Sequence, residues 1–450
     1  MTQLEAPGGA LTRPCGATRA TEPDRQPPTD HRWSPANARS SPFSALHYRN
    51  YRLLWIGNLI SNTGDWMDQV SFNWLVYSLT DSAVWLAVVN LCRFVPILVF
   101  TLIGGVVADR FEHKRMLFAT QTAAMGLAFV LTALVATRTA SLWMIMLLAA
   151  GRGVMNSFNQ PAKQSLVSDL VPEREVSNAI ALNAAQFNLT RVLGPSIGGL
   201  LIATIGIEWA FFLNGVSFLA VLGSLALMQL PARRVRRRNQ GMVRELGEGV
   251  SYLRSAPTLG MLVILALVPV VLGNPYLTML TVFASDVLHA GPAGLGLLTA
   301  CAAIGSVAGA LAVGTVEVRR PGLVMLGSLI LFGCALVAFA VSPWLAGSVV
   351  ALLAAGLGQQ VYTTLNNSVV QETVDERYRG RVLSMLFLSR GMVPLGTMLA
   401  GLGTAAAGPQ WSVGAMAGAL VLLALGVARF IPTVRQLALP LPLEDAGPDG

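Results

Sequence analysis

The chain has 450 residues, is 54% hydrophobic and is only 12% charged, whereas soluble domains carry roughly 25% charged residues. This composition excludes an ordinary soluble protein and indicates apolar segments near 20 residues long that cross a bilayer as helices. The net charge of +8 does not indicate nucleic-acid binding, because the basic residues gather in alternate loops, as in the run at residues 233–238, while Arg138 alone marks the opposite side. We therefore expect a multi-pass protein of the cell (inner) membrane with both termini in the cytoplasm.

The chain divides into five predicted regions. Residues 1–45 are rich in Pro, Ser, Thr and Arg and predict a disordered cytoplasmic tail. Two six-helix bundles follow, over residues 46–230 and 258–432. A basic cytoplasmic linker, residues 231–257, separates them, and residues 433–450 form a second cytoplasmic tail. The predicted spans are residues 52–78, 82–108, 116–137, 141–166, 176–205, 208–230, 258–286, 292–315, 322–341, 344–370, 381–406 and 410–432.

The first span carries a polar helical face that includes Asn58, Asn62 and Asp65. Ionisable residues inside a bilayer are costly and are therefore functional candidates. Asp65 and Asp68 are the mid-span carboxylates, and depth along the helices favours the pairs Asp68–Arg93 and Asp65–Arg152, although either carboxylate could serve either arginine. Our hypothesis is that Asp65, tuned by Arg152, binds and releases a coupling proton. The alternative is a permanent ion pair that only holds helices together.

The loop after the second span reads Gly104-Gly105-Val106-Val107-Ala108-Asp109-Arg110-Phe111-Glu112-His113-Lys114-Arg115. This segment resembles the signature loop of the major facilitator superfamily, and the resemblance covers about residues 50–432. It implies that Asp109 closes a cytoplasmic gate against the eleventh helix, where Arg381 offers a partner. The corresponding position in the second half is Gly314, which leaves Glu317 as the alternative acidic residue for a second such gate.

The fourth and fifth spans resemble antiporter motifs of the same superfamily. In the fourth, only Arg152 matches the motif. In the fifth, Gly194-Pro195-Ser196-Ile197-Gly198-Gly199 matches the Gly-Pro-x-x-Gly-Gly core of proton-coupled exporters. Ordinary helix packing by small residues is the alternative explanation of these glycines. Asn159-Gln160-Pro161-Ala162-Lys163-Gln164 resembles the branch that contains the enterobactin exporter and related drug exporters.

Further cavity candidates lie in the fifth and eleventh spans. Asn183 and Gln186 share a face of the fifth span, with Arg191 beside it, and Arg390 lies near mid-depth in the eleventh. Arg191 and Arg390 lack matching mid-span carboxylates in the second half, which favours a substrate with an anionic group.

The two halves resemble each other when the sequence is shifted by 203 residues, which aligns Gly198 with Gly401 and Glu173-Arg174 with Glu376-Arg377. Six spans per half make the repeats parallel, and such repeats enclose a site at the bilayer midplane. We therefore predict an all-α membrane protein of twelve transmembrane helices in two parallel six-helix repeats, the major facilitator fold.

The predicted function is a secondary active transporter, a proton-coupled exporter of a small organic molecule (a drug, siderophore or other metabolite) that works by alternating access. A proton-coupled nutrient importer is the first alternative, and a membrane sensor or membrane enzyme is the alternative from another class. The sequence has no phosphate-binding loop, metal motif or nucleophile motif. We therefore expect no enzymatic activity, metal or cofactor. The expected partners are the small-molecule substrate, protons and the lipid bilayer, with a monomeric chain.

Overall fold

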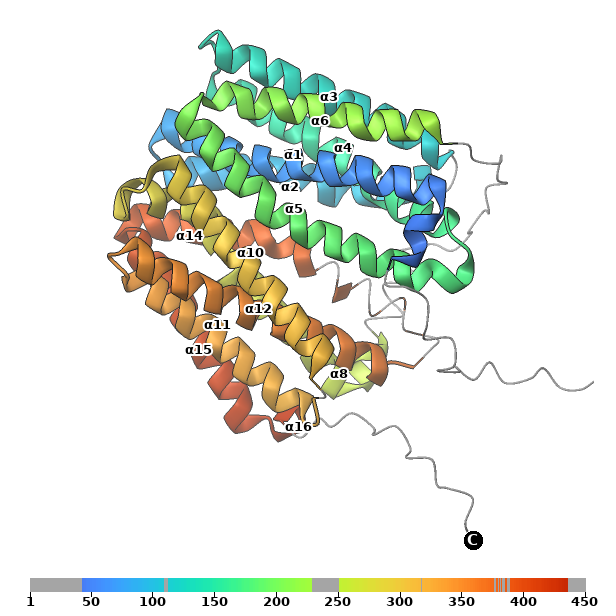
Figure 1. Cartoon of the computed structure of the whole chain (residues 1–450). Helices are drawn as coiled ribbons and strands as arrows, with labels where there is room; N and C mark the ends of the chain where they lie inside the picture. Colours follow the sequence, from blue (N-terminus) through green and yellow to red (C-terminus); the bar gives the residue numbers. More distant parts are fainter. Residues whose placement is uncertain are drawn as a thin grey trace, which may run out of the picture. The chain divides into compact units, whose positions relative to one another are not determined.

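The computed structural model describes residues 43–108, 112–228, 251–316, 318–375, 378, 380, 382, 385–386 and 389–435, and these are almost entirely helical (Figure 1). The predicted tails, most of the linker 231–257, Asp109, Arg110 and Arg381 lie outside these residues. No β-strand occurs in the part of the chain that the structure describes, which confirms the predicted all-α class.

The first six predicted spans each correspond to one long helix. These helices form what we call the N-terminal half: α1 (Arg49–Thr80), α2 (Ala83–Ala108), α3 (His113–Ala136), α4 (Leu142–Asp169), α5 (Val176–Thr204) and α6 (Ile207–Leu227), with the short 3-10 turns η2 (Ser44–His47) and η3 (Glu173–Glu175). Pro96 and Pro195 lie inside α2 and α5.

The seventh predicted span is an interrupted helix. It consists of α8 (Pro257–Val268), the π-helical turn η4 (Pro269–Gly273), α9 (Tyr276–Val282) and a second π-helical turn, η5 (Phe283–Val287). Pro269 and Pro275 lack the amide hydrogen that a regular helix needs, which accounts for the break around η4.

The rest of what we call the C-terminal half returns to regular helices. It contains α10 (Gly291–Thr315), α11 (Pro321–Val341), α12 (Leu345–Thr373), η6 (Arg390–Met392), α14 (Val393–Ala407), α15 (Pro409–Phe430) and α16 (Pro432–Arg435). Of the predicted eleventh span, residues 381–406, the structure describes mainly η6 and α14.

Eight helical stretches of the described chain are long and apolar enough to cross a membrane by length and composition: α2, α3, α6, the stretch from α8 to η5, α10, α11, α12 and α15. The other long helices, α1, α4 and α5, have 32, 28 and 29 residues but carry more polar side chains. These three polar helices also supply most of the candidate site described below.

Helix packing repeats between the halves. In the N-terminal half α2 packs on α4 and α3 on α6; in the C-terminal half α10 packs on α12 and α11 on α15. Gly153 lies against the carbonyl oxygen of Arg93, and Gly356, 203 residues later, lies against that of Ala302. A side chain at either position would collide with the neighbouring backbone, so these glycines allow the close approach of the paired helices. The repeated pairs agree with the predicted parallel repeat.

The two halves meet where α5 packs on α10 and α2 packs on α14. At this seam, a Cβ atom on Gly199 would lie 2.6 Å from the Pro292 carbonyl oxygen and 2.9 Å from Gly296 Cα. Gly401 lies similarly close to Ala83 and Ala87. These contacts lie where α1 and α5 end and α2 and α10 begin, which we call the Asp81 end of the protein.

Gly199→Ala should therefore destabilise the seam, by about 1–3 kcal/mol if the overpacked backbone must shift. Thermal unfolding of the purified protein in detergent measures this effect as a lower midpoint. Gly223→Ala is the matched control, because nothing lies within 4 Å of a Cβ atom at Gly223, and a helical alanine is favoured over glycine. Equal midpoints for the two variants would contradict close packing at Gly199.

Candidate functional site

Two adjoining cavities lie between helices of the N-terminal half. The first has a volume of about 220 Å³ and the second about 450 Å³. They share the lining residues Asn62, Gln160 and Phe187, so they lie side by side. The first is lined by Asn62, Asp65, Trp66, Gln69, Arg93, Gln121, Ala124, Arg152, Met155, Asn156, Asn159, Gln160, Phe187 and Phe218. The second is lined by Asn62, Gln160, Lys163, Val167, Ile180, Asn183, Gln186 and Phe187.

The polar face of α1 turns toward these cavities, as the sequence spacing predicts. Asn62, Asp65, Trp66 and Gln69 line the first cavity. The adjacent side of α1 packs closely on α5, because Gly194 lies against the Thr63 carbonyl oxygen and the Trp66 Cβ atom. The Trp66 and Phe187 rings meet edge to face with their centroids 5.7 Å apart. An aromatic wall and a polar wall therefore face the same space.

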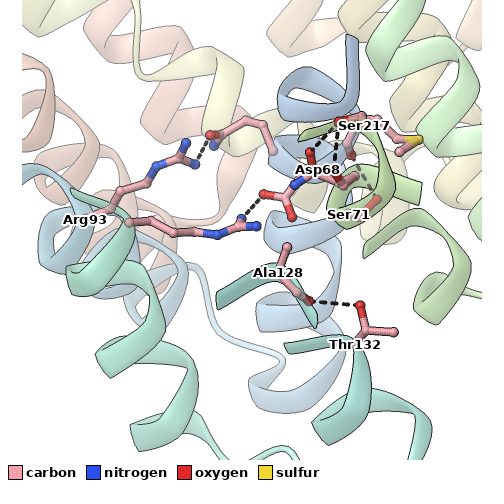
Figure 2. A network of polar contacts seen from close by, with 10 residues as sticks. Asp68, Ser71, Arg93, Ala128, Thr132 and Ser217 are labelled. Carbon is pink, nitrogen blue, oxygen red and sulfur yellow. Dashed lines mark hydrogen bonds and ion pairs between the residues drawn. The ribbon is translucent and has the colours of Figure 1, made fainter. Parts of the chain in front are cut away.

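The ion pair in this site joins Asp68 of α1 to Arg152 of α4 (Figure 2). Asp68 is almost fully buried, at 1% exposure, and the pair leaves its second carboxylate oxygen, Oδ1, without a hydrogen bond in the described structure. Neither pairing that the depth estimate favoured, Asp68–Arg93 or Asp65–Arg152, is formed. The depth count was too coarse to separate two carboxylates that lie one helical turn apart.

Arg93 of α2 donates a hydrogen bond to the side-chain oxygen of Gln69 on α1. Its side chain runs beside the Asp68 pair (Figure 2), and Arg93 lines the first cavity. Arg93 makes no ion pair with any residue that the structure describes. The cavity therefore contains one arginine that is neutralised by a carboxylate and one that is held only by a neutral amide.

Asp65 differs from Asp68 in its surroundings. It lies in the middle of α1, yet its side chain is exposed because it faces the cavity. No hydrogen bond or ion pair joins it to another described residue, although Arg152, Lys163 and Arg93 are close enough to attract its charge and Asp68 close enough to repel it. Asp65 is therefore an accessible carboxylate in a largely cationic environment.

Lys163 of α4 lies in the second cavity and donates a 3.1 Å hydrogen bond to the side-chain oxygen of Asn62. Asn183 and Gln186 of α5 line the same cavity. Asn183 accepts a 3.3 Å hydrogen bond from the Tyr51 hydroxyl, and Gln186 donates a 3.0 Å bond to the Trp55 carbonyl oxygen. These contacts hold the predicted amides at the cavity wall and connect α5 to the start of α1.

Two predicted cavity residues have other positions, and a third is not described. Asn58 is buried and lines neither cavity. Arg191 also lies outside both linings, and its charge acts on Tyr276 of α9. The side chain of Arg390 is outside the described residues. The prediction of an anionic substrate group from Arg191 and Arg390 therefore has no support from the geometry of this site.

The two motif predictions are only partly tested by the structure. Gly104 and Gly105 lie in α2, Lys114 donates a 2.7 Å hydrogen bond to the Met228 carbonyl oxygen, and Arg115 pairs with Glu112 at 2.8 Å. The gate between Asp109 and Arg381 stays a prediction. In the antiporter-like motif, Gly194 and Gly198 lie against α1 and Gly199 lies against α10, with Pro195 within the same helix. These glycines therefore act in close helix packing, whatever further role they have.

Five further residues line the cavities without having been predicted as site residues: Gln121, Asn156, Asn159, Gln160 and Lys163. Gln121 is 4% exposed, and its side-chain oxygen has no partner among the described residues, like that of Asn159. The sequence does contain a signal for four of these residues. Together with Arg152 they recur at helical spacing and form one polar face of α4: Asn156, Asn159, Gln160 and Lys163. Gln121 stands alone in the third span, and nothing in the sequence marks it.

Metal binding has no basis in the described residues, because no group of three or more His, Cys, Asp or Glu side chains is close enough to hold an ion. The polar groups at the cavity wall are carboxylate, guanidinium, amine and amide groups. Such groups bind an organic molecule or a proton.

Comparison with known sequences gives matches along most of the chain. The model of a family described as "Transmembrane secretion effector" matches residues 40–439. The chain is 30% identical to the multidrug efflux pump Tap of Mycobacterium tuberculosis, over 86% of this chain and 94% of that protein. It is 28% identical to a staphyloferrin A transporter of Staphylococcus aureus, over 75% and 85% of the two chains. It is 23% identical to macrolide efflux protein A of Streptococcus pyogenes, over 87% and 99%.

Solved structures share the fold at low sequence identity. A mutant peptide transporter in complex with alafosfalin aligns with a TM-score of 0.71 and 14% identity, over 89% of this chain and 97% of that one. A bacterial homolog of the lysosomal transporter Spinster, in an inward-facing and occupied conformation, aligns with a TM-score of 0.65 and 16% identity, over 88% and 99%. These likenesses concern the fold alone.

Proposed function

Because the chain belongs to the transmembrane secretion effector family of the major facilitator superfamily, and is thus a membrane-embedded secondary transporter of small molecules, we propose that it exports an organic molecule in exchange for protons. In this proposal it lies in the inner membrane, both termini face the cytoplasm, and the exporting unit is one chain. The positive-inside distribution of arginine and lysine supports this orientation.

The observation that carries the proposal is the contrast between Asp65 and Asp68. Asp68 is buried and paired with Arg152, so it stabilises the contact between α1 and α4. Asp65, one turn away, faces the cavity and has no direct partner among the described residues. A carboxylate that can be reached by water in mid-membrane and is surrounded by Arg93, Arg152 and Lys163 can exchange a proton as the distances to those cations change.

The chemistry of the cavity supports an organic substrate of mixed character. Trp66 and Phe187 provide aromatic surface, and the amides of Asn62, Gln121 and Asn159 provide hydrogen-bonding groups. Ligand sites of this kind bind molecules with both apolar and polar parts. The names of the relatives include drugs and a siderophore, so we propose that the substrate is a drug-like compound, a siderophore or another secreted metabolite.

Uptake into everted membrane vesicles tests this function. In such vesicles the cytoplasmic face is outside, and an acidic interior reproduces the natural proton gradient. A labelled macrolide antibiotic and labelled staphyloferrin A serve as probes, and vesicles without the protein serve as controls. We expect the protein to concentrate at least one probe inside, and we expect nigericin, which collapses the pH gradient, to stop this accumulation.

Each result separates one part of the proposal. Accumulation that persists after the gradient is collapsed would contradict proton coupling. Movement of a probe in the opposite direction under the same gradient would support the importer instead. A protein that moves neither probe would contradict the proposed substrate classes.

A further inference from the structure

A hydrogen bond connects the two halves at the Asp81 end. The hydroxyl of Tyr77, near the end of α1, donates to the carboxylate oxygen Oδ2 of Asp286 in η5. Between the residues that the structure describes, this is the one side-chain hydrogen bond that joins an α1–α6 residue to an α8–α16 residue. The neighbouring contacts across the seam are packing contacts of small residues, such as Gly199 with Gly296 and Gly401 with Ala87.

Tyr77 has a second acceptor within its own half. Asp81 follows α1 directly, in a left-handed conformation with φ of 48°, and its backbone N–H donates a 2.8 Å hydrogen bond to the Tyr77 carbonyl oxygen. This i, i+4 placement keeps the Asp81 carboxylate near the Tyr77 hydroxyl. Tyr77 is 6% exposed, so its hydroxyl needs a partner in any conformation that keeps it buried. A phenol has one hydrogen to donate and can make one such bond at a time.

We propose that Tyr77 is the latch of the outer gate: its hydroxyl bonds to Asp286 when the halves are closed at the Asp81 end, and transfers to Asp81 when they separate there. This assignment rests on alternating access and on the orientation proposed above, in which the Asp81 end faces outward. The transfer keeps the hydroxyl paired in both conformations. Opening therefore exchanges one charge-assisted hydrogen bond for another and leaves no polar group unpaired.

The position of Asp286 suits this role. It lies in the π-helical turn η5 at the end of the interrupted seventh span, and its side chain is exposed apart from the contact with Tyr77. Water can therefore replace Tyr77 at Asp286 at little cost after separation, whereas the buried hydroxyl depends on Asp81. In this structure the hydroxyl bonds to Asp286, and in our proposal this bond is the stronger of the two and favours the closed form.

Labelling of a buried seam residue from outside the cell measures this balance. The reporter is Ala87→Cys, which is fully buried against Gly401 when the seam is closed, in a full-length chain whose four native cysteines are replaced by serine. A membrane-impermeant maleimide is added to intact cells, and the labelling rate follows the fraction of molecules that are open outward. The assay needs neither substrate nor a proton gradient, so its outcome is independent of the proposed transport function.

We expect Tyr77→Phe to raise the labelling rate severalfold, because the closed form loses the stronger bond to Asp286 and the open form only the weaker bond to Asp81. Asp286→Ala should raise it similarly, and the double variant no further, because both changes remove the same bond. Asp81→Gly keeps the left-handed backbone but leaves the hydroxyl without an acceptor in the open form, and should lower the rate roughly tenfold.

Ser71→Ala is the matched control. It removes a buried hydroxyl of the same helix that donates a 2.9 Å hydrogen bond to the Met67 carbonyl oxygen within α1, so the labelling rate should not change. An unchanged rate in Tyr77→Phe would overturn the latch. A rate that rises as much in Ser71→Ala as in Tyr77→Phe would also overturn it, since general loosening would then explain both. An unchanged or faster rate in Asp81→Gly would overturn the transfer to Asp81.

Discussion

Asp65→Asn is expected to remove the dependence of substrate accumulation on the pH gradient. If one proton is exchanged for each substrate, accumulation can rise up to about tenfold per pH unit of gradient, because one pH unit is equivalent to about 1.36 kcal/mol. Asparagine keeps the shape of Asp65 but cannot bind a proton as a base. The steady-state ratio of substrate across the vesicle membrane should therefore fall to about one.

Two further measurements distinguish loss of coupling from loss of the protein's function as a whole. Asp65→Asn should still exchange labelled for unlabelled substrate across the membrane at equal pH, because this exchange requires only binding and alternating access. Asp65→Glu keeps a titratable carboxylate in the cavity and should retain gradient-driven accumulation. Accumulation by Asp65→Asn with the pH dependence of the parent would show that the coupling proton binds elsewhere.

Arg152→Gln is expected to cause the largest loss of stability among the cavity variants. Asp68 is 1% exposed, and Arg152 is its ion-pair partner. Removing one member of a buried pair leaves an uncompensated charge, which costs about 3–5 kcal/mol. The thermal midpoint and the yield of monodisperse protein in detergent should both fall.

The double variant Arg152→Gln with Asp68→Asn should recover much of this stability, because a neutral amide no longer needs the arginine. Arg115→Gln is the contrasting single change: its pair with Glu112 has side chains 86% and 54% exposed, and such surface pairs contribute little. If Arg152→Gln and Arg115→Gln unfold at the same temperature, the Asp68 pair does not stabilise the fold.

Composition and periodicity were sufficient to predict the helical class, the order of the helices and the polar face of α1. Hydropathy identifies segments that must satisfy their backbone hydrogen bonds internally, and helices do so regardless of the details of packing. The same argument explains why the interruption of the seventh span was missed: its side chains remain apolar along most of its length, and only Pro269 and Pro275 indicate the break.

The ion pairs required information that a linear sequence does not contain. Which carboxylate meets Arg152 depends on the rotation of α1 and α4 about their axes, and Gly153 affects that contact because it lets α4 approach α2 at Arg93. The polar face of α4 was visible in the spacing of Asn156, Asn159 and Lys163, but most of these residues were interpreted only as part of a family motif. The gate between Asp109 and Arg381 lies outside the described residues and stays a prediction.

All described residues that line the two cavities belong to the N-terminal half, although both halves have the same helix pairing. Under the proposed function, one repeat thus contributes the side chains that recognise the substrate, while the other contributes a surface against which the first moves. The second repeat is consequently under weaker chemical constraint at its equivalent positions, and its sequence can diverge as long as its packing glycines persist. Inherited changes in cargo preference should accordingly accumulate on α1, α4 and α5, while changes in turnover speed should arise along the seam.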